Sequence, residues 1–330
     1  MFPTRRQFLA SGAIAAASSA FPALAQARTP LKIGMLRIAN AMFVGVDQKF
    51  FEKQGLDVEI VFFRSGAELI PSLSRGQIDV AATSGGAALY NTLAAGVNSR
   101  IVGDYFSLVP GSRSHGVLVR KDLIGSQIKT AADLKGRTLA ITAQGQYTHY
   151  VAAQTLAKAG LAESDVRFVQ MPYQDIPAAL TGGAIDAGCS VEPYITLTKK
   201  NGAADVLTWD SETAPNLQAA VLMYGERLAT KERALGEAFM RGYRASVAFE
   251  HEALTDEAKR KQVAASFQKQ LPVEDPTLYE RTGWPMAKLS CVADRASLDS
   301  QLEWYAARGL VRQKPDLAAY VDNSFVEAAR

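Results

Sequence analysis

The residues best suited to do chemistry in this sequence are small polar residues that directly follow apolar, strand-like segments. Four such groups occur: Asn40, Ser65–Gly66, Thr83–Gly86 and Gln144–Thr148. Each also stands where a helix is predicted to begin. Helix N-termini offer free N–H groups and a partial positive charge, so they bind polar or anionic ligand groups without a lysine or arginine. Ordinary helix capping explains any one group alone, and several that converge indicate a binding site.

The sequence lacks the motifs that are typical of catalysis. It has neither a Gly-x-Ser-x-Gly elbow nor a phosphate loop ending in Gly-Lys-Ser or Gly-Lys-Thr. The histidines at positions 115, 149 and 251 are not spaced as metal ligands. A nucleophilic pair of a cysteine and a histidine is left open by the sequence. We expect a protein without a cofactor or metal that is not an enzyme.

The elements that position the four groups form an α/β pattern. Strand-like segments alternate with amphipathic segments, which predicts mostly parallel sheets with crossover helices. The predicted strands are Leu31–Leu36, Leu56–Phe63, Ile78–Ala82, Arg100–Tyr105, Gly116–Arg120, Thr138–Thr142, Val166–Gln170, Ala184–Cys189, Ala204–Thr208 and Ala219–Tyr224. The predicted helices begin at the four polar groups, and the first of them is expected to run from Asn40 to Gly55, with Val46 and Phe50 at helical spacing. Further helices are predicted at Thr130–Gly136, which opens on a capping box, and at Asp175–Thr181.

The pattern occurs twice, which predicts two lobes. Residues 28–112 and 213–330 are assigned to lobe 1, and residues 113–212 to lobe 2. A Gly-x-Ile-Asp sequence begins at Gly76 and recurs at Gly183, at the matching place in each lobe. After Gln218 the pattern becomes helical, with a long helix over Thr230–Glu252 whose apolar residues recur every four positions. We expect this C-terminal portion to pack on lobe 1.

Residues 1–25 read as a twin-arginine export signal. Arg5 and Arg6 precede a mildly apolar stretch, and Ala23-x-Ala25 supplies the small residues of a cleavage site. The mature chain is therefore expected to be soluble and periplasmic. In that oxidising compartment Cys189 and Cys291 form either a disulfide or two buried thiols.

Composition narrows the class of partner. The chain has 330 residues, 48% of them hydrophobic and 21% charged, with a net charge of +3. These values are typical of a globular protein, and a near-neutral chain argues against nucleic acid or an anionic membrane as partner. We expect a monomer that binds a small molecule.

Several segments resemble periplasmic solute-binding proteins of the sulfonate, taurine and nitrate type, which are kin to thiamine-precursor binding proteins. The segments that carry the resemblance are Leu31–Gly34, Phe50–Glu59, Ser74–Val80, Lys129–Gly136, Ile185–Ala187 and Glu192–Tyr194. It implies the fold of a type II periplasmic binding protein, with two α/β lobes, a two-strand hinge and a ligand held between the lobes. It also implies an inner-membrane ABC permease as partner.

The resemblance implies a set of ligand contacts. They are Asn40, Phe43, Ser65, Gly66, Thr83, Ser84, Gly85, Gln146, Tyr147, Thr148 and Glu192. Relatives often carry Gly-Ser-Ser or Gly-Ser-Thr before the second-lobe helix, where this chain has Gly145-Gln146-Tyr147-Thr148. An aromatic residue there favours a ligand with a ring over a plain sulfonate.

Other candidates have two interpretations each. Tyr105 and Phe106 end a strand near the hinge and line either the pocket or the core, and Tyr173 and Trp209 are weaker candidates of the same kind. Glu192 either accepts from an amine of the ligand or caps the helix that follows it. Arg37 faces either the cleft or solvent.

The expected ligand is a sulfonate, a carboxylate or a heterocycle like a vitamin precursor, taken up by closure of the lobes. Two alternatives remain at this point. One is an enzyme on the same scaffold, similar to a thiamine-pyrimidine synthase, although the cysteine-rich motif of those enzymes is absent. The other is a ligand-sensing partner of a membrane kinase.

Overall fold

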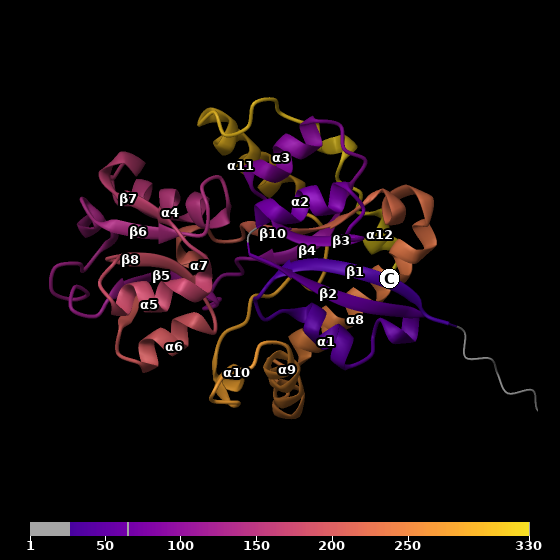
Figure 1. The fold of residues 1–330 in the computed structure, drawn as a ribbon, viewed down its shortest axis with the longest axis horizontal. Coiled ribbons are helices and arrows are strands. Elements are labelled where there is room, and N and C mark those ends of the chain that lie inside the picture. The colour runs from indigo at the N-terminus through magenta and orange to yellow at the C-terminus, as the bar shows by residue number, and fades with distance from the viewer. Residues whose placement is uncertain (1–26, 65, 330) are drawn as a thin grey trace, which may run out of the picture.

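The computed structural model describes residues 27–64 and 66–329, and the predicted export signal lies outside them. Two lobes lie side by side, each built on a five-stranded sheet with helices on both faces (Figure 1). The strand order is β2-β1-β3-β10-β4 in the first sheet and β7-β6-β8-β5-β9 in the second. The predicted two-lobed α/β fold is confirmed.

All ten predicted strands are present. The first sheet contains β1 (Thr29–Leu36), β2 (Leu56–Phe63), β3 (Val80–Ser84), β4 (Arg100–Ser107) and β10 (Gln218–Tyr224). The second contains β5 (His115–Arg120), β6 (Thr138–Ile141), β7 (Arg167–Gln170), β8 (Ala187–Val191) and β9 (Ala204–Trp209). In each sheet one strand runs antiparallel to both of its neighbours. This strand is β10 in the first sheet and β5 in the second. Each is the first strand after the chain crosses between the sheets.

The repeated Gly-x-Ile-Asp sequence anchors one strand in each sheet. The Lys32 backbone N–H donates to Asp79 Oδ2 at 2.8 Å, and the Thr138 backbone N–H donates to Asp186 Oδ2 at 2.9 Å. Asp79 thus links the segment before β3 to the parallel strand β1, and Asp186 links the segment before β8 to the parallel strand β6. The strands predicted to begin at Ile78 and Ala184 begin later, because the Ile-Asp pair forms the approach to β3 and β8.

The helices of the two sheets follow the strand ends. Those of the first lobe are α1 (Ala41–Asp47), α2 (Gly66–Ser74) and α3 (Ala87–Ala94). Those of the second lobe are α4 (Tyr147–Lys158), α5 (Ile176–Thr181), α6 (Tyr194–Lys200) and α7 (Asp210–Thr213). Short 3-10 turns occupy Glu52–Gln54, Ala131–Leu134, Glu163–Asp165, Tyr173–Asp175 and Leu317–Ala319. The helix that was expected to continue to Gly55 ends at Asp47, and the Glu52–Gln54 turn closes at Gly55 with φ 76°.

The C-terminal portion is helical, as predicted. Its elements are a π-helical turn Arg227–Lys231, α8 (Arg233–Glu252), α9 (Glu257–Gln270), α10 (Leu278–Arg281), α11 (Arg295–Ala307) and α12 (Ser324–Ala328). The predicted apolar face of α8 buries Phe239, Tyr243 and Val247 in the core of the first sheet. Within the part of the chain that is described, no helix has both the length and the apolar composition of a membrane span.

Cys189 and Cys291 are two buried thiols, which was one of the two alternatives left by the sequence. Cys189 packs in a core of the second lobe and Cys291 in a core of the first. Burial raises the pKa of Cys291 to about 12 and that of Cys189 well above its usual value. Neither thiol is activated as a nucleophile, because the thiolate is the reactive form.

Candidate functional site

A cavity lies where the two sheets meet. It has about 720 Å³ of space not filled by protein atoms, part of it open to solvent. The parallel strands point their carboxyl ends at it, and the antiparallel β5 and β10 begin there. The lining residues are Leu36, Ile38, Asn40, Gly66, Ala82, Thr83, Ser84, Tyr105, Phe106, His115, Thr142, Gln146, Tyr147, Tyr173, Ala219, Ala220 and Pro285.

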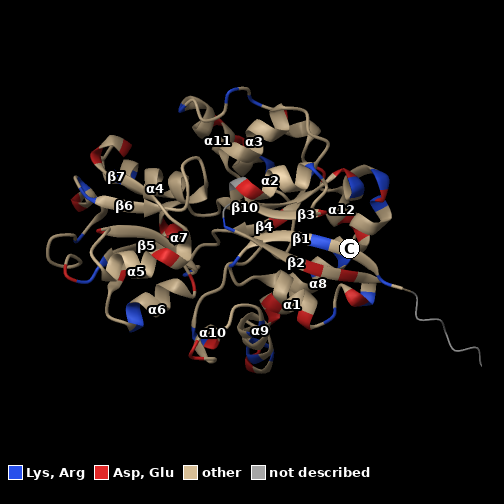
Figure 2. Cartoon of the chain, viewed as in Figure 1, with Lys and Arg blue, Asp and Glu red and all other residues tan. Residues whose placement is uncertain are grey.

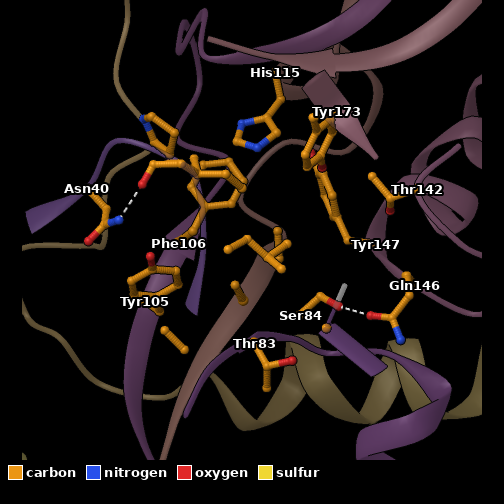
Figure 3. Close-up of a pocket in the computed structure, with 17 residues that line it drawn as sticks. Asn40, Thr83, Ser84, Tyr105, Phe106, His115, Thr142, Gln146, Tyr147 and Tyr173 are labelled. Atoms are coloured by element: carbon orange, nitrogen blue, oxygen red, sulfur yellow. Dashed lines mark hydrogen bonds between the residues drawn. The ribbon is translucent and has the colours of Figure 1, made fainter. Parts of the chain in front are cut away.

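Aromatic rings from both lobes form one wall of the cavity (Figure 3). Phe106, from the first lobe, stacks on His115 with ring centroids 4.3 Å apart. Tyr147 meets both rings edge-on, at 6.0 Å from Phe106 and 5.5 Å from His115. Tyr173 meets His115 at 6.4 Å. This arrangement favours a flat ligand, because rings attract one another in stacked or edge-to-face geometry.

No lysine, arginine, aspartate or glutamate lines this cavity among the residues that the structure describes. Burial lowers the pKa of His115 to about 3, so its ring is neutral at ordinary pH. The Nδ1 atom of that ring lies 3.1 Å from Ser114 Oγ. Burying a fully charged group without a countercharge is costly. The cavity therefore suits an uncharged ring better than an anion.

A buried carboxyl group stands behind the aromatic wall. The Tyr147 hydroxyl donates to Asp210 Oδ2 at 2.6 Å, and Asp210 is 2% exposed. Burial raises the pKa of Asp210 to about 7, and the hydrogen bond from Tyr147 acts in the opposite direction. With its proton directed at Asp210, the Tyr147 oxygen offers a lone pair to a donor group of a ligand.

Unpaired hydroxyl groups supply the remaining polarity. In residues 27–64 and 66–329, the hydroxyls of Thr83, Tyr105 and Tyr173 make no hydrogen bond to another described residue. Thr142 differs, because its hydroxyl lies 2.7 Å from that of Thr148. Unsatisfied hydroxyls at an apolar cavity provide orientation and specificity for a bound molecule.

Direct contacts across the rim hold the lobes together. The Ser84 hydroxyl donates to Gln146 Oε1, as Figure 3 shows, and the Ala87 backbone N–H donates to the Gly145 carbonyl at 2.7 Å. A Cβ atom at Gly86 would lie 2.6 Å from that same carbonyl. The lobes therefore approach this closely only because position 86 carries no side chain.

A second set of contacts links the lobes outside the cavity. The Gly145 backbone N–H donates to His149 Nδ1 at 3.1 Å, so His149 Nε2 carries the proton and donates to Glu163 Oε2 at 2.7 Å. Glu163 Oε1 accepts from Arg308 Nε of the first lobe at 2.7 Å. The Arg308 guanidinium also lies 3.8 Å from the ring centre of Trp304. We call His149, Glu163 and Arg308 the interlobe latch.

Replacing Arg308 with alanine is expected to weaken ligand binding about two- to fivefold without touching the ligand. The variant loses the ion pair with Glu163, a partly exposed contact between the lobes that contributes about 1 kcal/mol or less to the closed arrangement. Apparent affinity falls with the population of the binding-competent state. Calorimetry with the ligand found by the screen below measures the effect. Arg312→Ala is the control, and equal affinities for both variants and wild type would remove the latch from the account.

The structure places seven of the predicted contacts in the cavity lining. They are Asn40, Gly66, Thr83, Ser84, Tyr105, Gln146 and Tyr147. Phe106, which was a candidate together with Tyr105, and the weaker candidate Tyr173 also line it. Ser65 lies outside the described residues.

The other predicted contacts lie elsewhere. Phe43 is fully buried in the core, edge-on to Phe62 at 6.1 Å. Thr148 accepts from the Thr142 backbone N–H at 2.9 Å, and Gly85 is not among the lining residues. Glu192 caps α6 through two hydrogen bonds from Thr196, at 3.1 and 2.8 Å, and lies in a separate groove.

Trp209 lines that same groove, and Arg37 is exposed in a hollow beside the cavity. For Glu192, capping is thus the interpretation that the structure supports. Burial raises the pKa of its carboxyl group to about 7, against the opposing effect of the bonds from Thr196.

Sequence reasoning missed three kinds of lining residue. His115 and Ala219 lie at the starts of the two antiparallel strands. Both strands were predicted, but it was not predicted that their first residues line the cavity. Thr142 directly follows β6, so the same rule that selected Thr83 applies to it. Pro285 comes from the C-terminal portion, and no local signal connects it to the cavity.

Three comparisons with known proteins show which proteins this chain resembles. The model of the family described as NMT1/THI5 like matches residues 39–253. A relative in Escherichia coli named "Putative aliphatic sulfonates-binding protein" is 27% identical over 75% of this chain and 73% of its own. The structure of the alkanesulfonate-binding protein SsuA of Xanthomonas axonopodis, bound to MOPS, is 20% identical with a TM-score of 0.73. It covers 89% of this chain and 98% of its own.

The fold also occurs in an enzyme. The structure of the desulfurization enzyme DszB is 16% identical, covers 92% of this chain and 99% of its own, and gives a TM-score of 0.66. The scaffold alone therefore does not separate binding from catalysis, and function must be argued from the site.

Proposed function

Because the chain belongs to the NMT1/THI5-like family, we propose that it is a periplasmic solute-binding protein that delivers a small organic molecule to an ABC permease. The observation that carries this proposal is the cavity that both lobes line and that their rim contacts close. Ligand held between two lobes favours the closed state by its contacts with both. The ligand is released without chemical change.

The ligand proposed for this cavity has a planar ring. The wall of Phe106, His115 and Tyr147 favours a ring, and the unpaired hydroxyls favour polar substituents on it. The relative in Escherichia coli, named for aliphatic sulfonates, supports an organic acid as the class of solute. The ligand is thus an aromatic or heterocyclic compound that carries hydrogen-bonding groups.

An enzyme on this scaffold is the less supported alternative. Both cysteines are buried away from the cavity, with raised pKa values, so neither thiol serves as nucleophile there. His115 has no carboxylate partner among the described hydrogen bonds, and its ring packs against Phe106 and Tyr147 as part of the aromatic wall. These side chains support binding rather than bond cleavage.

A thermal-shift screen tests the proposed function. The purified mature protein is heated with a library of sulfonates, carboxylates, pyrimidines and larger heterocycles. A true ligand at a hundredfold excess over its dissociation constant is expected to stabilise the fold by about 2.7 kcal/mol. Native mass spectrometry of the complex after incubation then shows the intact ligand. Conversion of the ligand, or stabilisation by no compound in the library, would contradict the receptor function.

A further inference from the structure

A second hollow opens beside the cavity, next to β1 and β2. We call it the entrance hollow, and it has about 510 Å³ of space not filled by protein atoms, part of it open to solvent. Its lining residues are Leu36, Arg37, Ile38, Phe62, Phe63, Arg64, Tyr173 and Gln174. Leu36, Ile38 and Tyr173 also line the cavity. The two spaces therefore adjoin across these three side chains.

The entrance hollow carries positive charge that the cavity lacks. Arg37 and Arg64 both line it and are exposed, and no carboxylate lines it among the described residues. Neither guanidinium forms an ion pair within residues 27–64 and 66–329. The backbone N–H of Arg64 donates to Glu68 Oε2 at 3.4 Å, a contact that leaves its guanidinium free of that carboxylate among the described ion pairs.

Arg37 is the better oriented of the two arginines. Its guanidinium lies 4.4 Å from the ring centre of Phe62, a cation–π contact that restricts the side chain. A guanidinium held in this way keeps its N–H groups available at the edges of its plane. Those N–H groups match the geometry of carboxylate and sulfonate oxygens, to which arginine donates two parallel hydrogen bonds.

We propose that Arg37, with Arg64 beside it, binds the anionic group of an elongated ligand whose ring lies in the cavity. This inference rests on the proposed function and narrows the ligand to an aryl or heteroaryl acid with a short arm. The distribution of charge carries it. An anion inside the cavity would be buried without a cation and near the Asp210 carboxyl, which is unfavourable, whereas two cations stand immediately outside.

Matched acids and amides test the position of the anion. The probes are phenylacetate, 3-phenylpropionate, 4-phenylbutyrate and 5-phenylvalerate, their primary amides, and 3-phenylpropane-1-sulfonate. Calorimetry on the wild-type protein is expected to show the best acid binding roughly tenfold tighter than its amide, as for a charge-assisted hydrogen bond. The measurement with the sulfonate shows whether the protein prefers a sulfonate or a carboxylate.

Arg37→Gln is expected to abolish the preference for the acid. Affinity for the acid falls roughly tenfold through faster dissociation, because a direct contact is lost, and affinity for the amide is unchanged. Lys32→Gln is the matched control, since it removes the same charge from β1, the strand that Arg37 directly follows. Lys32 is paired with Glu59 at 3.4 Å and lies outside the hollow.

Several outcomes would overturn this inference. An unchanged ratio of acid to amide affinity in Arg37→Gln, or a slower association rate alone, would show that Arg37 does not hold the anion. Failure of every probe in the series, while an unrelated compound binds in the thermal-shift screen, would remove the aryl acid and leave the receptor function standing. Failure of the whole screen would instead contradict the receptor function.

Discussion

Replacing Tyr147 with alanine is expected to weaken ligand binding by about 30- to 1000-fold. The ring supplies one face of the aromatic wall, and a buried aromatic contact contributes about 2–4 kcal/mol when burial and ring geometry are combined. Tyr147 is 5% exposed and meets Phe106 and His115 edge-on, so its loss opens the wall where both lobes contribute. Isothermal titration with the ligand from the screen measures the change.

Two further variants distinguish the contribution of the Tyr147 ring from that of its hydroxyl and from a general effect on folding. Tyr147→Phe keeps the ring, so a change below about fivefold indicates that ring contact dominates affinity. Tyr320→Ala truncates a tyrosine that lies against Arg100, outside the cavity lining, and is expected to bind normally. Wild-type affinity in a folded Tyr147→Ala protein would show that the ligand does not contact this wall.

The second large effect is on stability, in the variant Asp210→Asn. Burial raises the pKa of Asp210 to about 7 in the folded chain, above the value of 3.8 for the free side chain. The folded state therefore holds a proton that the unfolded state has released, and stability falls as pH rises between these values. The total loss is on the order of 4 kcal/mol, at about 1.4 kcal/mol for each pKa unit.

Asparagine keeps the shape of the side chain and its hydrogen bond from Tyr147 but does not ionise. Asp210→Asn is thus expected to gain stability over the wild type progressively from pH 4 to pH 8. Urea unfolding of both proteins across this range gives the difference directly. Other buried acids, such as Asp104 with a pKa raised to about 6 by burial, remain in both proteins, so their effects cancel in the comparison.

Asp205→Asn is the matched control in the same lobe. Hydrogen bonding and charge attraction from Lys199, at 2.8 Å, lower the pKa of this aspartate below its free value of 3.8. Its contribution to stability is therefore lost only below about pH 4, and the difference between Asp205→Asn and the wild type is expected to stay constant from pH 4 to pH 8. The pair is half exposed, which limits the effect to about 1 kcal/mol or less. A stability difference for Asp210→Asn that does not change with pH would mean that this carboxyl group titrates normally in the folded chain.

The order of strands and helices was predictable from the local sequence pattern. The element boundaries that were predicted wrongly have local causes. Ile78 and Ile185 are buried and apolar like strand residues. Each precedes an aspartate whose carboxylate accepts a hydrogen bond from a backbone N–H of the neighbouring strand, so the regular strand begins only after the aspartate. The helix after Asn40 was predicted too long because Val46 and Phe50 keep helical spacing across its end. Hydrophobic spacing reports which residues face the core, and it does not report where the backbone hydrogen bonds stop.

The candidate site was predictable where it depends on strand ends. Thr83 and Ser84 end β3, and Gln146 lies in the loop after β6. The carboxyl ends of these strands face the edge where open sheets bind ligands. Phe43 was misplaced because a helix N-terminus offers one face to the cleft and another to the core, and this apolar side chain packs in the core. Composition at a helix start does not distinguish the two faces.

Other parts of the site depend on contacts between distant segments. Asp210 and Tyr147 are 63 residues apart, and Arg308 and Glu163 are 145 apart. Nothing in the residues around each partner indicates that the two meet. Tertiary packing alone brings the C-terminal helices against the second lobe, so the latch and the buried carboxyl group required the structure.

A crystal structure of the mature protein with its ligand tests the central claim most directly. We expect one unaltered molecule between the lobes, with its ring against Phe106, His115 and Tyr147 and contacts from both lobes. Ligand found instead in the groove between α6 and α10, or on one lobe alone with the cavity empty, would contradict it.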